Sequence, residues 1–186
     1  MRRNKILAPV AAALMLSAAP VLGQAAFSDG FSFLKGVRER DAGKVQELAS
    51  RPNPAILNYR DTSTGEGALH ILVRDREIDW LRFLLARGAR PDIETNDGTT
   101  PLIMAAQIGW QQGAEELLDR RANPNVANRN GETPLIFAVQ RRDLAMVRLL
   151  RSRGADPNQT DHLSGNSALD YARQDSRAAA IVRELE

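Results

Sequence analysis

Cysteine is absent from the 186-residue sequence, and histidine occurs only twice, at His70 and His162. The lack of cysteine excludes disulfide bonds, thiolate nucleophiles and sulfur-ligated metals. Two histidines without an H-x-x-H or H-E-x-x-H spacing do not indicate a metal site. The sequence also lacks a G-x-S-x-G turn and a phosphate-binding glycine loop. We therefore expect no catalytic residues, no cofactor and no metal ion.

A strong charge of one sign is also missing, since the formal net charge is +2. Residues 1–25 contain three basic and no acidic residues. Of the 25 basic and 23 acidic residues of the whole sequence, 22 and 23 therefore lie beyond residue 25, a net charge of −1. Such a mixed surface lacks the basic patch of a nucleic-acid-binding protein. We expect no nucleic-acid partner.

The first 25 residues resemble a secretory signal peptide. Basic residues are followed by the uncharged, apolar run Ile6–Leu22 and then by small residues, which is the order found in such signals. The alternative is a membrane anchor, but a run of 17 residues with two prolines is short for a span. We predict cleavage after Gly23 or Ala25 and no membrane span afterwards. Arginine outnumbers lysine 22 to 3, which is typical of GC-rich bacterial genomes, so we expect a periplasmic or, alternatively, a secreted protein.

Beyond residue 60 the sequence repeats with a period of 33 residues. Five sets of positions keep this spacing: Gly65, Gly98 and Gly131; Leu69, Leu102 and Leu135; Leu84, Leu117 and Leu150; Ala89, Ala122 and Ala155; Pro91, Pro124 and Pro157. A fixed period of this length indicates a stack of small, similar units. A single unit cannot bury its own apolar faces, so its stability has to come from its neighbours.

One unit, residues 95–127, shows what each repeat contains. Asn96-Asp97-Gly98 is typical of a turn, and Thr100-Pro101 is typical of a helix start, since threonine can cap the helix and proline suits its first turn. Apolar residues at helical spacing follow up to Gly109, and a second apolar stripe follows that glycine. The pattern predicts two short helices joined by a tight turn.

The segments Gly98-Thr99-Thr100-Pro101-Leu102 and Gly131-Glu132-Thr133-Pro134-Leu135 resemble the ankyrin repeat, whose signature is G-x-T-P-L-H. The resemblance implies an all-α solenoid of stacked helix-turn-helix units with hairpin loops. It places repeats at 61–94, 95–127, 128–160 and 161–186, after a divergent capping repeat at 26–60.

Several positions depart from the repeat signature. His70 keeps the signature histidine, but Ile103 and Ile136 replace it in later repeats, so we expect weaker ties between their loops. Arg121 stands where Gly88 and Gly154 close the second helix of their repeats, and we expect it to adopt a left-handed conformation. Trp80, on the apolar stripe of a second helix, is expected in the core.

The resemblance further implies a protein-binding module whose concave face meets a protein partner. Trp110 could be partly buried between repeats or an exposed anchor. The candidate binding residues, carried over by register, are Glu66, Arg74, Asp75, Asn96, Asp97, Thr99, Gln107, Ile108, Trp110, Arg129, Asn130, Glu132, Gln140 and Arg141. Two other functions stay open at this point: an exported effector that acts outside the cell, and an enzyme with an unrecognised site.

Overall fold

The structure is a computed structural model that describes residues 21–53 and 55–186. These residues form ten helices and no strand longer than an isolated bridge. The helices are α1 (Val21–Glu39), α2 (Ala42–Ala49), α3 (Ala68–Arg74), α4 (Ile78–Ala86), α5 (Pro101–Ile108), α6 (Gln111–Asp119), α7 (Pro134–Gln140), α8 (Leu144–Ser152), α9 (Ala168–Gln174) and α10 (Ala179–Leu185). The expected all-α solenoid is confirmed.

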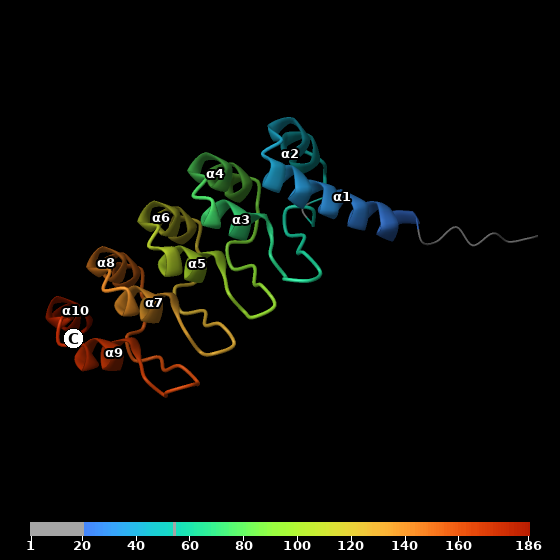
Figure 1. Ribbon diagram of the computed structural model, residues 1–186. Coiled ribbons are helices and arrows are strands. Elements are labelled where there is room, and N and C mark those ends of the chain that lie inside the picture. The colour runs from blue at the N-terminus through green and yellow to red at the C-terminus, as the bar shows by residue number, and fades with distance from the viewer. Residues whose placement is uncertain (1–20, 54) are drawn as a thin grey trace, which may run out of the picture.

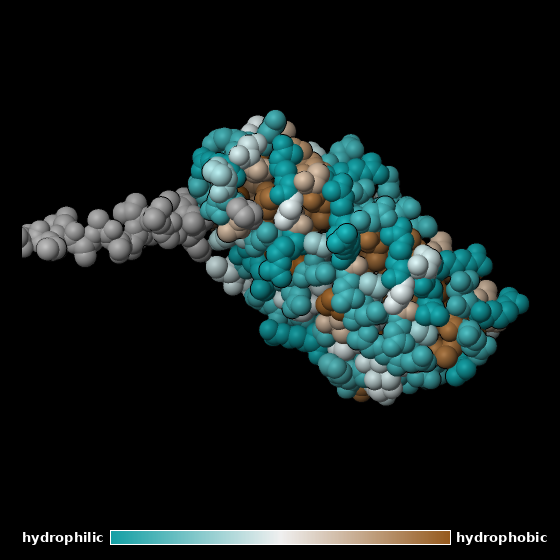
Figure 2. All heavy atoms as spheres, turned by 180° about the vertical axis from the view of Figure 1, so that it is seen from behind, coloured by the Kyte–Doolittle hydropathy of each residue, from teal (hydrophilic) through white to brown (hydrophobic). Residues whose placement is uncertain are grey.

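The helices lie in two rows (Figure 1). The first helices of the units, α3, α5, α7 and α9, pack side by side in one row, and α4, α6, α8 and α10 form the second row. The long loops between units all project to the same side, next to the first row (Figure 1). Seen from behind, the surface is mostly hydrophilic, with apolar atoms only in small patches (Figure 2).

Polar side chains cap the N-terminus of the first helix in each unit. The hydroxyls of Thr100 and Thr133 accept hydrogen bonds from the backbone N–H three residues later, at 3.2 Å, and a proline follows each. Where Thr-Pro is lacking, Ser167 and Asp170 cap each other reciprocally, and the Nδ1 atom of His70 accepts from the N–H of Gly67. The helix starts are therefore kept although the signature changes.

The core is continuous through the stack. Leu69, Leu102 and Leu135 are at most 1% exposed, and the small Ala105 and Ala138 are fully buried, which lets adjacent helices approach closely. Trp80, expected in the core, is only partly buried, because α2 does not pack on α4 as closely as α6 does.

The described part of the chain begins with α1, before the first full repeat. The predicted signal peptide lies largely outside the described residues, and its end, from Val21, belongs to α1. The helix pair α1 and α2 precedes the first full repeat, and Val37 and Val45 join its core to that of the stack. Among the described helices, none combines the length and hydropathy needed to cross a membrane.

Left-handed residues end the helices at regular positions. Arg121 has a φ of 65°, as expected from its alignment with Gly88 and Gly154, whose φ angles are 92° and 87°. Arg76 and Arg142 are also left-handed, at the turn between the two helices of their units. Their guanidinium groups bind the next unit, at the carbonyl of Ile108 and the carboxylate of Asp175 respectively.

The exposed Arg121 has no such contact among the described residues, so its backbone strain is not offset. We predict that Arg121→Gly raises the free energy of unfolding by about 1 kcal/mol, because glycine removes the penalty of the left-handed conformation. Thermal and urea unfolding measure the effect. Arg142→Gly is the matched control, and it should gain less because it also loses the bond to Asp175. An unchanged or lower stability of Arg121→Gly would contradict the prediction.

Candidate protein-binding face

One side of the stack carries most of the candidate residues. It is formed by the hairpin loops at 61–66, 95–99, 128–132 and 161–166 and by the C-terminal ends of α3, α5, α7 and α9 (Figure 1). We call this surface the hairpin face. Its residues come from all four predicted repeats, so its shape depends on how rigidly the hairpins are joined.

Backbone hydrogen bonds join each hairpin to the next. The N–H groups of Asn96, Arg129 and His162 donate to the carbonyls of the preceding hairpin at 2.9, 2.9 and 2.7 Å. This bond is present at all three junctions, with and without the signature histidine, so it does not replace the tie that the histidine makes. His70 adds a tie of its own, since its Nε2 atom lies 2.9 Å from the carbonyl oxygen of Thr99. Burial lowers the pKa of His70, so the ring is neutral and can bridge the two backbone groups.

Several candidate residues form hydrogen bonds within a hairpin or between adjacent hairpins. The amide of Asn96 donates to the carbonyl of Ser63, and Glu132 accepts from Asn128. The hydroxyl of Thr95 donates to Asp97 and lowers the pKa of that carboxyl. The prediction that Thr99 is an exposed binding residue is wrong. Thr99 is only 6% exposed, and its carbonyl oxygen accepts a hydrogen bond from the hydroxyl of Thr95. These side chains stabilise the hairpins, so fewer of their polar groups are free to bind a partner.

The reading of Trp110 as an exposed anchor is also wrong. It precedes α6, is 7% exposed, and its indole ring lies on Gly113. A Cβ atom at Gly113 would come within 2.0 Å of the ring, so only glycine leaves room for it. Trp110 belongs to the hydrophobic core and packs on Gly113 of α6.

The charged side chains of the first repeat form ion pairs on the hairpin face, whereas two arginines of the third repeat do not, within the part of the chain that the structure describes. Arg74 lies 2.6 Å from Glu66 and 3.8 Å from Asp75, so these three candidates form an ion-pair cluster. Arg129 and Arg141 are exposed, and neither makes a salt bridge among the described residues. The guanidinium of Arg141 lies over Gly109, beside Ile108 and Gln107, which are half-buried. Exposed Gln140 and Asn130 complete this polar region.

The hairpin face is hollowed between α7 and α9. A depression of about 550 Å³ is lined by Val139, Gln140, Tyr171, Gln174, Asp175, Ser176 and Arg177. Gln140 was predicted from the register, but Tyr171 and Arg177 were not named. The signal for Tyr171 was available, since this position holds a large apolar residue in the preceding units, Phe137 and Met104. The exposed polar residues and the hollow thus lie on adjacent units.

A buried carboxylate shapes the hairpin beside this hollow. Asp161 is 3% exposed and accepts hydrogen bonds from the hydroxyl of Tyr171, at 2.5 Å, from Ser164, and from the N–H groups of Leu163 and Gly165. These bonds, first of all that from Tyr171, lower the pKa of Asp161 to about 2. The hairpin is one residue longer than the preceding one and presents Leu163, which is 77% exposed, to the solvent.

This hairpin should lose stability in acid. Because the pKa of Asp161 is lower in the folded chain, its contribution is present above pH about 4 and is lost as the pH falls through about 2. We predict that Asp161→Asn lowers stability at neutral pH by about 1–3 kcal/mol and flattens its decline in acid, because an amide cannot satisfy the same donors. Urea unfolding at a series of pH values measures both effects. Asp79→Asn, at an exposed position, is the control. An equal change of stability in the two variants would contradict the role of Asp161 in the last hairpin.

The comparison with known proteins identifies the family. A family model described as "Ankyrin repeats (3 copies)" matches residues 37–128, 69–161 and 109–185, which together cover most of the chain. The chain belongs to the ankyrin-repeat family. The human 2-5A-dependent ribonuclease is 33% identical over 86 residues, a match of 46% of this chain and 11% of the ribonuclease. Ankyrin-repeat domains are generally non-catalytic modules for protein–protein interaction, and the partial match to a nuclease does not carry its activity to this chain.

Proposed function

We propose that this ankyrin-repeat protein is exported and binds a folded protein partner through its hairpin face, the concave face of such stacks. The observation that carries the proposal is the pair of exposed arginines, Arg129 and Arg141, on the rigidly joined hairpin face that also contains the hollow of α7 and α9. Arginine that is exposed and not engaged by a carboxylate is a common anchor at protein interfaces.

The chemistry of this region defines the partner further. Two guanidinium groups and the amides of Gln140 and Gln174 favour a surface that offers carboxylates and backbone carbonyls. The partly exposed Tyr171 in the hollow and the exposed Leu163 of the last hairpin offer apolar contacts on the same face. A protein surface offers both polar and apolar groups, whereas a polyanion would gain nothing from the apolar contacts.

Affinity capture from the native compartment tests the binding proposal. The wild-type chain is compared with a variant that carries Gln140→Ala, Arg141→Ala and Gln174→Ala, and with a control that carries Glu115→Ala, Arg120→Ala and Arg148→Ala on the second row of helices. We expect a specific partner to be recovered with the wild type and the control and lost with the first variant. Equal recovery with all three chains would refute the role of the hairpin face.

The export proposal needs a separate test. The apolar run and the small residues around Gly23 support it. Cell fractionation with sequencing of the mature N-terminus should find the chain in the periplasm, beginning at Gln24 or Ala26. Recovery from the medium would favour an effector that acts outside the cell, and an intact N-terminus in the cytosol would contradict export.

A further inference from the structure

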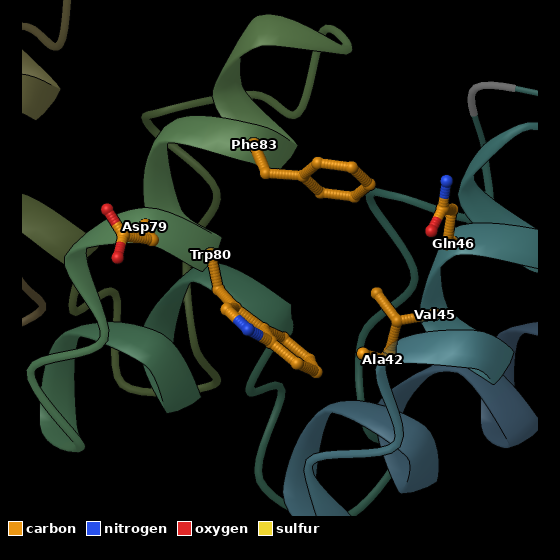
Figure 3. Close-up of a pocket in the computed structure, with 6 residues that line it drawn as sticks. All are labelled: Ala42, Val45, Gln46, Asp79, Trp80 and Phe83. Atoms are coloured by element: carbon orange, nitrogen blue, oxygen red, sulfur yellow. The ribbon is translucent and has the colours of Figure 1, made fainter.

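An apolar furrow opens between α2 and α4, in the second row of helices and away from the hairpin face. It has a volume of about 260 Å³ and is lined by Ala42, Val45 and Gln46 of α2 and by Asp79, Trp80 and Phe83 of α4. Figure 3 shows the rings of Trp80 and Phe83 projecting from α4 towards the smaller side chains of α2. Both rings are only partly buried.

The other junctions in this row are closed. Helix α4 packs on α6 and α6 on α8, and salt bridges such as Arg82–Glu116, at 2.9 Å, and Arg153–Asp119, at 2.8 Å, cross between them. No comparably close packing joins α2 to α4. A second, smaller hollow of about 50 Å³ continues the opening along the same junction, and it is lined by Val37, Arg40, Leu72, Asp75, Glu77 and Trp80. Arg40 and Glu77 form a salt bridge there at 3.0 Å. Trp80 therefore has open space that its counterparts in later units lack.

The charges at the furrow favour one kind of occupant. Asp79 is exposed beside Trp80 and makes no salt bridge with the described residues. The guanidinium of Arg87 lies 3.7 Å from the ring centroid of Phe83, so the Phe83 ring already contacts a cation, whereas Trp80 is partly exposed in the furrow. An apolar slot with a carboxylate at its rim is complementary to an apolar side chain that is close to a lysine or arginine.

We propose that the furrow between α2 and α4 is a second binding site, which takes a peptide segment bearing an apolar side chain next to a basic residue. The apolar side chain inserts between Trp80 and the facing side of α2, and the basic residue pairs with Asp79. Tryptophan is among the residues that contribute most to binding when a partner covers them, and the site lies on helices, which hold its two walls in place. The site is independent of the hairpin face.

Two sets of short fluorescein-labelled peptides test the proposal. Each peptide has a central Phe, Leu or Met among Ala and Ser, with a nearby Lys in one set and Glu in the other. Fluorescence anisotropy with the full chain should show tighter binding of the Lys set. Trp80→Ala should weaken that binding by about tenfold or more, and Asp79→Lys should reverse the preference towards the Glu set.

Matched variants keep the result interpretable. Phe31→Ala removes an aromatic ring that is 54% exposed outside the furrow, so it should leave binding of both peptide sets unchanged. Ala42→Phe fills the furrow from α2 without opening a cavity and should block binding even if Trp80→Ala destabilises the fold. Circular dichroism and thermal unfolding check that each variant is folded.

Three outcomes would overturn the proposal. The first is that no peptide of either set binds, and the second is that binding survives both Trp80→Ala and Ala42→Phe. The third is self-association of the chain that Ala42→Phe abolishes, measured by sedimentation, because the occupant of the furrow would then be a second copy. A Lys preference that persists in Asp79→Lys would refute the part assigned to that carboxylate.

Discussion

Leu102→Ala should lower the free energy of unfolding by about 3 kcal/mol, a large part of the stability of a small domain. Leu102 is fully buried on α5, and α5 packs on both α3 and α7. Truncation therefore leaves a cavity shared by three units, and the stack cannot close it by moving one helix. Urea unfolding followed by circular dichroism measures the change.

The same truncation at the end of the stack provides the control. Leu169 lies on α9 and is only partly buried, and among the described residues α9 packs on the first helix of one other unit, α7. We expect Leu169→Ala to lower the free energy of unfolding by about 1 kcal/mol, because less apolar surface is lost from the core. Equal losses at the two positions would contradict a core that is shared between neighbouring units.

Arg141→Glu should weaken binding of the protein partner by about tenfold or more, which corresponds to about 1.4 kcal/mol. The reversal places a carboxylate where the hairpin face now offers a guanidinium without a salt bridge among the described residues. Isothermal titration with the partner recovered by affinity capture measures the change. The stability of the chain should stay the same, because Arg141 is exposed.

A second charge reversal separates this local effect from a change in overall charge. Arg183→Glu alters the net charge equally but lies on α10, in the second row of helices. We expect partner binding to be unchanged in this variant. If both reversals weaken binding alike, the effect is long-range electrostatics and Arg141 is not a contact residue.

The repeat pattern predicted the helices and their order well. The period of 33 residues placed Leu69, Leu102 and Leu135 on equivalent helices, and the Thr100-Pro101 pair predicted a helix start that the structure has at that residue. Such features are local, since a cap or a left-handed turn depends on a few adjacent residues. The left-handed conformation of Arg121 was predicted on the same basis.

The burial of the two tryptophans could not be predicted in this way. The sequence predicted Trp80 in the core and did not decide between partial burial and exposure for Trp110. The structure buries Trp110 and leaves Trp80 only partly buried. Burial in a stack depends on how closely the neighbouring unit approaches, which the residues of one unit do not fix. Gly113, three residues after Trp110, was the local signal that the ring folds back onto its own helix.

Binding residues in the hairpins were difficult to assign for a related reason. Asn96 and Asp97 are equally suited to forming a turn and to contacting a partner, and their hydrogen bonds show that they shape the hairpins. No motif of the sequence singles out Asp161, although it is buried and organises the last hairpin. The exposed ends of the first helices, such as Gln140 and Arg141, are the part of the candidate site that register alone placed on the surface.

Site-specific photo-crosslinking in living cells tests most directly whether the chain acts by binding a protein through its hairpin face. A photoreactive residue is introduced in turn at Gln107, Gln140 and Gln174, and at Glu115 and Arg148 on the second row of helices. The account predicts adducts with one protein partner from the first three positions and none from the other two. Adducts from Glu115 and Arg148 alone, or no adduct from any of the five, would contradict it.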